Sequence, residues 1–186
     1  MRAPIGSFDN ARPAADRLDL LTAPVAAAVR AGWGGFPAEQ IIHVDTDPEI
    51  ADTSAFVEHH GAELLNRSAN CVVVAGKRGG EVTLAACLVL SHSRVDVNGT
   101  VRKHLGARKV RFASMDTAVG DTGMEYGGIT PVGLPAGWPL LIDSAVADEE
   151  WVLIGSGSRR GKLIMPGKAL AALPGAVVLE GLGIPG

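Results

Sequence analysis

A stretch rich in glycine and proline, residues 122–135, limits the possible folds of this chain more than any other feature. It holds four glycines and two prolines in fourteen residues, together with five large apolar or aromatic side chains. A flexible linker lacks such side chains, whereas glycine permits close backbone approach and proline fixes φ. The pair Gly127 and Gly128, followed by Pro131, therefore predicts a rigid, shaped loop whose amides line a small pocket. An ordinary tight connection between a helix and a strand is equally compatible with the pattern.

The bulk composition is that of one ordinary globular domain. The chain has 186 residues, of which 47% are apolar and 20% are charged, as is typical of a single folded domain. No apolar run approaches the roughly 18 residues of a membrane helix, and the first ten residues lack the apolar core of a signal peptide. The two cysteines, Cys71 and Cys87, have no metal-ligand spacing. We therefore expect reduced thiols, no metal or other cofactor, no membrane contact and a cytoplasmic location.

Short runs of strand type alternate irregularly with short helical segments. The runs at 71–75 and 82–90 flank a glycine-rich segment at 76–80, which predicts a hairpin with its turn in that segment. Asp47 and Pro48 are typical of a helix start, and His59 and His60 before a glycine are typical of its end. Further strands are expected at 41–44, 109–113, 140–142, 152–154, 163–165 and 177–179, and further helices at 101–105, 115–119 and from residue 166.

This irregular order predicts a mixed α/β (α+β) fold rather than a regular parallel array. We expect a curved, partly antiparallel sheet with short surrounding helices. Near the N-terminus, Pro13 is typical of the first turn of a helix, which continues past Pro24 through residues 25–31. We therefore expect residues 1–38 to form a helical appendage packed on a domain of residues 39–186.

Positive charge is concentrated in one segment of a chain whose net charge is −3. Between Arg94 and Arg111 there are six basic residues and one acidic residue, Asp96. Such an excess is typical of a surface that contacts a phosphate backbone, although short charge runs are more often solvated faces. The candidates for RNA contact are Arg102, Lys103, Arg108, Lys109 and Arg111.

A second glycine-rich segment, residues 155–161, combines Ser156 and Ser158 with Arg159 and Arg160. Its spacing is one residue too long for a dinucleotide-binding loop, and a strand rather than a helix is expected after it. The chain also has no phosphate-binding loop of the NTPase type and no nucleophile elbow between a strand and a helix. Arginine is well suited to a terminal phosphate, but the sequence alone favours a surface turn.

Five segments in a fixed order resemble the YbaK/EbsC family of aminoacyl-tRNA editing domains, which stand alone or are inserted into prolyl-tRNA synthetases. The segments are the loop at 127–133, the strand at 68–74, the helix and strand at 101–110, and residues 141–143 and 155–161. The resemblance spans roughly residues 40–180. It implies an editing-domain fold, a mischarged aminoacyl-tRNA bound by its acceptor end, and an aminoacyl-tRNA synthetase as a further candidate partner.

The resemblance also places the site. It implies Asn70, Gly127 and Gly128 as catalytic residues, with the two loop amides stabilising developing negative charge. Similar proteins carry a lysine where this chain has Asn70, and some carry an aspartate where it has Leu163. Asparagine carries no charge, so deacylation either relies on the amides and the substrate's own hydroxyl or is lost. The implied substrate-binding residues are Thr130, Pro131, Asp143, Ser156, Ser158, Arg159 and Arg160.

Three functions remain open. The first is a trans-editing deacylase, because an aminoacyl ester is already activated and its hydrolysis mainly needs a positioned water and oxyanion donors. The second is a non-catalytic tRNA-binding or synthetase-associated module. The third is a hydrolase of another small acyl ester.

Overall fold

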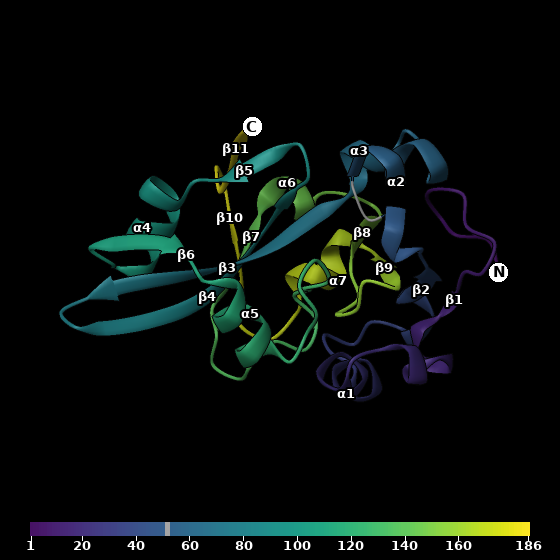
Figure 1. Cartoon of the computed structure of the whole chain (residues 1–186), viewed down its shortest axis with the longest axis horizontal. Helices are drawn as coiled ribbons and strands as arrows, with labels where there is room; N and C mark the ends of the chain where they lie inside the picture. The colour runs from purple at the N-terminus through teal and green to yellow at the C-terminus, as the bar shows by residue number, and fades with distance from the viewer. Residues whose placement is uncertain (51–52) are drawn as a thin grey trace.

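The computed structural model describes residues 1–50 and 53–186 as short helices packed around three sheets (Figure 1). The five-stranded sheet has the order β10 (Ala176–Leu179), β7 (Leu140–Asp143), β4 (Glu81–Leu90), β3 (Ala69–Arg78) and β6 (Lys109–Phe112). The four-stranded sheet has the order β1 (Arg12–Pro13), β2 (Ile42–Asp45), β9 (Gly161–Met165) and β8 (Val152–Gly155), and the third sheet pairs β11 (Gly183–Pro185) with β5 (Ser93–Val95). The helices are α1 (Ala23–Ala31), α2 (Thr53–His60), α3 (Leu64–Arg67), α4 (Arg102–Leu105), α5 (Met115–Thr122), α6 (Ser144–Ala147) and α7 (Gly167–Ala171).

Parallel and antiparallel pairs occur in the same sheet. β7 runs parallel to both β4 and β10, whereas β3 runs antiparallel to both β4 and β6. The predicted mixed α/β fold with a partly antiparallel sheet is therefore confirmed. The six strands predicted outside the hairpin are present, with bounds within two residues of those expected.

The hairpin of β3 and β4 is the longest of the strand pairings described and runs from the centre of Figure 1 to its left side, where the turn lies. Its turn is shorter than predicted, because only Gly79 and Gly80 lie between the strands. Their φ angles are 56° and 87°, and a two-residue turn with positive φ at both positions matches the twist of the flanking strands. Pairing therefore continues through Gly76, Lys77 and Arg78, beyond the strand end that the sequence predicts.

The two faces of β4 are buried in two different cores. Ala86 and Leu88 belong to the large core that also holds residues of β7, β8 and β9. Cys87 and Val89, which alternate with them as a strand requires, belong to a smaller core beside α4 and β5. Because both of its faces are covered, this strand reads as a continuous apolar run.

The N-terminal segment contributes a strand to a sheet and side chains to the large core, which is more than an appendage packed on the domain would do. Pro13, predicted to open a helix, lies in β1 and pairs with Ile42 of β2. Only α1 is an α-helix in this segment, with Pro24 in its first turn, and its Val25 and Val29 are buried in the large core. Residues 1–38 and residues 39–186 thus share one core.

The helix predicted from Asp47 to His60 is present in two parts. Its start is a single 3-10 turn, Pro48–Ile50, where Asp47 Oδ1 accepts the Glu49 N–H at 2.9 Å, and its end is α2. Residues 51 and 52 of the predicted helix lie outside the described residues. No helix in the described part of the chain is long and apolar enough to cross a membrane.

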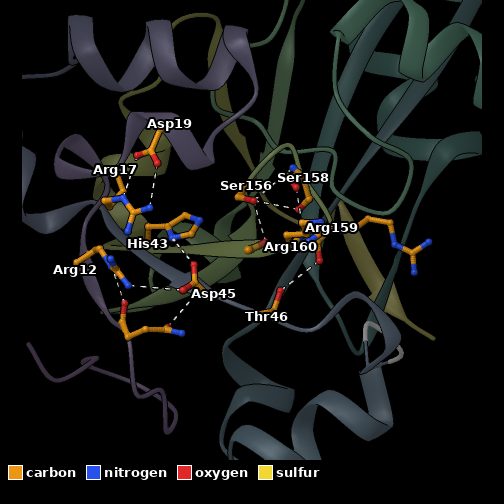
Figure 2. A network of polar contacts seen from close by, with 12 residues as sticks. Arg12, Arg17, Asp19, His43, Asp45, Thr46, Ser156, Ser158, Arg159 and Arg160 are labelled. Carbon is orange, nitrogen blue, oxygen red and sulfur yellow. Dashed lines mark hydrogen bonds and ion pairs between the residues drawn. The ribbon is translucent and has the colours of Figure 1, made fainter.

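A polar network joins β1, β2 and the turns that follow β1 (Figure 2). At its centre His43 is only 1% exposed, with Nδ1 3.7 Å from Asp45 Oδ1. Asp45 also pairs with Arg12 at 3.6 Å, and Arg17 holds Asp19 through two hydrogen bonds of 3.0 Å. Burial lowers the pKa of His43; Asp45 opposes this shift, whereas Arg12 and Arg17 reinforce it.

Acidification below about pH 6.5 is expected to destabilise the protein through His43. Because the pKa of His43 is lowered on folding, the unfolded chain binds the proton more tightly, and the free energy of unfolding falls as the pH drops through about 6.5, by at most about 1.4 kcal/mol per pH unit. Urea unfolding from about pH 8 to pH 5 measures this slope. His43→Leu should flatten it, whereas a change at the exposed His59, His59→Gln, should not. The assignment fails if His43→Leu retains the wild-type slope.

Candidate functional site

A cavity of about 520 Å³ lies where the five-stranded sheet meets the four-stranded one. Its lining includes Asn70 at the start of β3, Phe112 at the end of β6, Gly127 of the long loop, and Gly155 and Lys162 of the two neighbouring strands β8 and β9. Residues far apart in the sequence therefore surround one cavity with Asn70. Gly127 belongs to the first glycine-rich loop, Gly155 begins the second, and Lys162 directly follows it. The volume is in the range of small-molecule sites, roughly 300–1,000 Å³.

The cavity opens on an uncovered edge of β3. β6 pairs only with residues Val74 to Lys77, and Ala113 adds one more bond by donating its N–H to the Val73 carbonyl at 2.9 Å. Cys71, two residues earlier, directs its backbone groups to the same edge because such groups alternate along a strand. The chain has turned into α5 by then, and β8 reaches this side only through an isolated parallel bridge between Leu153 and Ser68, which precedes β3, so within the described residues no strand pairs with Cys71 on this edge. A free sheet edge offers backbone donors and acceptors to a ligand.

The two glycine loops touch through their backbones. Gly157 donates its N–H to the Gly128 carbonyl at 2.7 Å, and Glu125 donates its N–H to the Gly157 carbonyl at 2.8 Å. A Cβ atom added to Gly128 would lie 2.8 Å from the backbone carbon of Ser158, and one added to Gly155 would lie 2.7 Å from the Gly128 oxygen. Glycine at these positions is therefore required by close backbone approach, which confirms the shaped loop but not a chemical role for it.

The hydrogen bonds of this loop change the predicted pair of amide donors. The Gly128 N–H already donates to the Glu125 carbonyl at 2.9 Å, so it is not available to a substrate. The amides of Gly127 and Ile129 have no acceptor among the described residues, and both residues line the cavity. The donors that the geometry offers are therefore Gly127 and Ile129, in place of Gly127 and Gly128.

Several predicted substrate-binding residues do not line the cavity. Thr130 is fully buried, and its Oγ1 has no hydrogen-bond partner in the described structure. Pro131 lines a different hollow, of about 580 Å³, beside Trp33 and Trp138. Asp143 is buried at the end of β7, two strands away from β3, where its Oδ2 faces the backbone of β11.

The serines of the second loop shape that loop instead of facing the cavity. Ser156 is buried, and its hydroxyl lies within hydrogen-bonding distance of the Ser158 and Gly161 carbonyls, at 3.1 and 2.9 Å. The Ser158 hydroxyl accepts the Arg160 N–H at 3.1 Å. Arg159 and Arg160 are exposed, and the stem of Arg159 packs against Gly127. Of these four residues, Arg159 is therefore placed beside the cavity.

The predicted RNA-contact residues are all exposed and lie on α4, on β6 and between these elements, and we call this group the basic patch. The hairpin extends it, because Lys77 lies opposite Lys109 and Arg78 donates to the Gly106 carbonyl at 2.8 Å. The basic patch consists of Lys77, Arg78, Arg102, Lys103, Arg108, Lys109 and Arg111, all of them exposed.

Cys71 and Lys162 are among the cavity residues that sequence reasoning did not assign to the site. Burial raises the pKa of the Cys71 thiol well above its usual range, and Cys87 adds to the shift, so the thiol is not a nucleophile at neutral pH. Lys162 alternates with core residues of β9, and that strand position was the signal available in the sequence. Among the described residues no three His, Cys, Asp or Glu side chains are grouped to hold a metal ion.

The fold and the cavity define a mixed α/β domain with a ligand-sized site at a free sheet edge. The chain belongs to the aminoacyl-tRNA editing domain family, whose model matches residues 47–173. A protein proposed to be a trans-editing enzyme for prolyl-tRNA synthetase has the same fold, with a TM-score of 0.68 and 21% identity over 88% of this chain and 99% of that one. A hypothetical protein scores 0.67 at 20% identity (87% and 99% covered), and a structure from computational epitope grafting on scaffold proteins scores 0.71 at 21% identity (89% and 97% covered).

Gly128→Ala is expected to lower the free energy of unfolding by about 1–3 kcal/mol, because the added methyl group overlaps backbone atoms that cannot move independently. Gly120→Ala is the matched control, since Gly120 lies in α5 with open space where its Cβ would be, and alanine is the better helix former. Urea denaturation of both variants measures the difference. Equal stability of Gly128→Ala and wild type would contradict the tight contact between the loops.

Proposed function

We propose that the protein is a trans-editing deacylase that hydrolyses the ester of a mischarged aminoacyl-tRNA in the cytoplasm. The observation that carries the proposal is the meeting of Asn70, Gly127 and Ile129 in one cavity of a domain that belongs to the editing family over most of its length. A synthetase that produces the mischarged tRNA is the protein partner that this role implies.

Hydrolysis of this ester requires few catalytic side chains. Water attacks the ester carbonyl, the bond between the acyl carbon and the ribose oxygen breaks, and the proton released by the water ends on that ribose hydroxyl. The free amides of Gly127 and Ile129 are suited to the negative charge that develops on the carbonyl oxygen, and Asn70 is suited to orienting the acyl end. Since the described lining holds no carboxylate or imidazole, a positioned water and the neighbouring ribose hydroxyl would carry the proton.

The basic patch supports an RNA substrate. β6 connects it to the cavity, because Lys109 belongs to the patch while Phe112 and Ala113 line the cavity. At about 3.3 Å per strand residue, Lys109 and Ala113 are roughly 13 Å apart. An acceptor stem on the patch would then leave its single-stranded end within reach of the ester-binding loop.

Gly127→Ala should slow deacylation at least tenfold, since the positive φ of 84° resists a side chain and would shift the amide, and one oxyanion donor is worth about 10²–10³ in rate elsewhere. Gly137→Ala is the matched control, because Gly137 has a φ of 83° but nothing within 4 Å of its Cβ position and lies outside the cavity. Release of amino acid from a panel of mischarged tRNAs measures the rate. Unchanged turnover in Gly127→Ala would rule out the amide.

The same assay separates the alternatives. Asn70→Ala should cost less than Gly127→Ala, since a neutral hydrogen bond contributes about 0.5–1.5 kcal/mol. A wild type that is inert on every tRNA, together with a gain of activity in Asn70→Lys, would select a non-catalytic module. Turnover of small acyl esters but of no tRNA would select a different hydrolase.

Affinity for tRNA should fall steeply as salt rises, because each phosphate neutralised by the basic patch releases counterions. Changing Arg102 and Lys103 together to Ala should reduce the slope of log affinity against log salt by about 1–2. Changing Arg30 and Lys168 together to Ala removes the same charge from exposed positions on α1 and α7 and should leave the slope unchanged. Filter binding over a salt series gives both slopes, and identical slopes for the two double variants would place the RNA elsewhere.

A further inference from the structure

Lys162 is the one charged residue that lines the candidate cavity within the described part of the chain. It lies in the middle of the four-stranded sheet, with Val44 of β2 opposite it on one side and Gly155 of β8 on the other. Gly155 and Gly127 line the same cavity. Since both are glycines, no side chain from either position stands between Lys162 and the space of the cavity.

The ammonium group of Lys162 is held in place without being neutralised by the residues described. It lies 5.9 Å from the centroid of the Phe56 ring, within the range of a cation–π contact. Its three N–H donors have no acceptor, and no carboxylate lies within salt-bridge distance, among residues 1–50 and 54–186. Burial lowers the pKa of Lys162 and the charge of Arg159 lowers it further. A partly buried cation with free donors is stabilised by an anion.

Arg159 brings a second positive charge to the same end of the cavity. Its stem lies 3.7 Å from the position that a Cβ atom of Gly127 would take, and its Nη2 donates to the Pro48 carbonyl at 3.2 Å. Figure 2 shows this side chain extending away from the cluster of His43 and Asp45. The nearby carboxylate of Glu125 accepts the Arg159 backbone N–H at 2.9 Å and fixes the loop, but within the described residues it forms no ion pair with the guanidinium.

We propose that Lys162 and Arg159 form an anion subsite that binds the 5′-phosphate of the substrate's terminal nucleotide. The inference rests on the proposed function and adds the group that fixes the nucleotide. Lys162 lines the same cavity as Gly127, and the stem of Arg159 lies beside Gly127. The Gly127 amide would face the ester, and the 5′-phosphate and the esterified hydroxyl belong to the same ribose. A phosphate here and a carbonyl oxygen at Gly127 would hold the reacting ester from both sides, which is the positioning that such a hydrolysis needs.

This subsite is distinct from the basic patch. The patch lies on α4, β3 and β6, whereas Lys162 belongs to the other sheet. The single-stranded end of the RNA would therefore cross the cavity before its last phosphate reaches Lys162. Charges on the patch would then set overall affinity, and Lys162 would set the position of the last nucleotide.

The probes are adenosine 5′-monophosphate and adenosine, which differ only in the phosphate. Calorimetry or NMR titration of the full chain should show the monophosphate bound about tenfold more tightly, as expected for charge-assisted hydrogen bonds. Lys162→Met keeps much of the apolar stem and should reduce this preference to below about threefold while adenosine affinity is retained. Lys168→Met, at an exposed position on α7, removes one charge elsewhere and should leave the preference unchanged. Lys162→Arg keeps the charge and should preserve it, which serves as the test if Lys162→Met does not fold.

The subsite is overturned if wild type binds the two probes equally or binds neither, or if Lys162→Met keeps the full preference. It is also overturned if Lys162→Arg loses the preference while remaining folded. These outcomes are separate from those of the deacylation assay. A phosphate preference without turnover supports the subsite and removes the editing activity, whereas turnover without a phosphate preference does the reverse.

Discussion

The candidate site depends on a contact between two stretches of backbone. The loop after α5 and the loop between β8 and β9 approach until the Gly128 carbonyl accepts the Gly157 N–H at 2.7 Å. Side chains at Gly128 or Gly155 would prevent this approach. Because the contact uses backbone groups, it fixes the direction of the loop and therefore the direction of the Gly127 and Ile129 amides. Preorganised donors of this kind need no rearrangement when charge develops.

The second loop is held from its other side by the four-stranded sheet. Thr46 donates its N–H to the Arg160 carbonyl at 3.0 Å, directly after β2. The buried ring of His43 fills the space where a Gly161 side chain would lie. The network around His43 thus supports the position of the loop that carries Arg159, although none of the residues of that network lines the cavity.

The fold could be predicted from the sequence because local patterns and tertiary structure agree in most elements. The apolar runs of β3 and β4, the Ser114 cap of α5 and the glycine that ends α4 each specify their own structure. Prediction was wrong where partners far along the chain decide the outcome. Pro13 joins a strand because Ile42 offers an edge, and no periodicity in residues 12–21 reveals that edge.

The sequence could predict which segments lie at the candidate site. It could not predict which of their backbone and side-chain groups face the cavity. Gly127 and Asn70 meet in one cavity, as the family resemblance implied. Whether Gly128 has a free N–H depends on the turn made by Glu125, which composition does not reveal. Thr130 and Asp143 look like polar site residues in the sequence, yet both are buried away from the cavity, since a polar residue type does not indicate which way its side chain points.

The neutral residue at position 70 is consistent with the electrostatics of the cavity. Asn70 and Lys162 line the same space, and Arg159 already disfavours the charge on Lys162. A further cation at position 70 would add like-charge repulsion to a group that burial also penalises. An uncharged side chain there can orient a ligand by hydrogen bonds without opposing Lys162. In this chain the positive charge of the cavity comes from β9 and the loop before it, and β3 contributes a polar side chain and a free backbone edge.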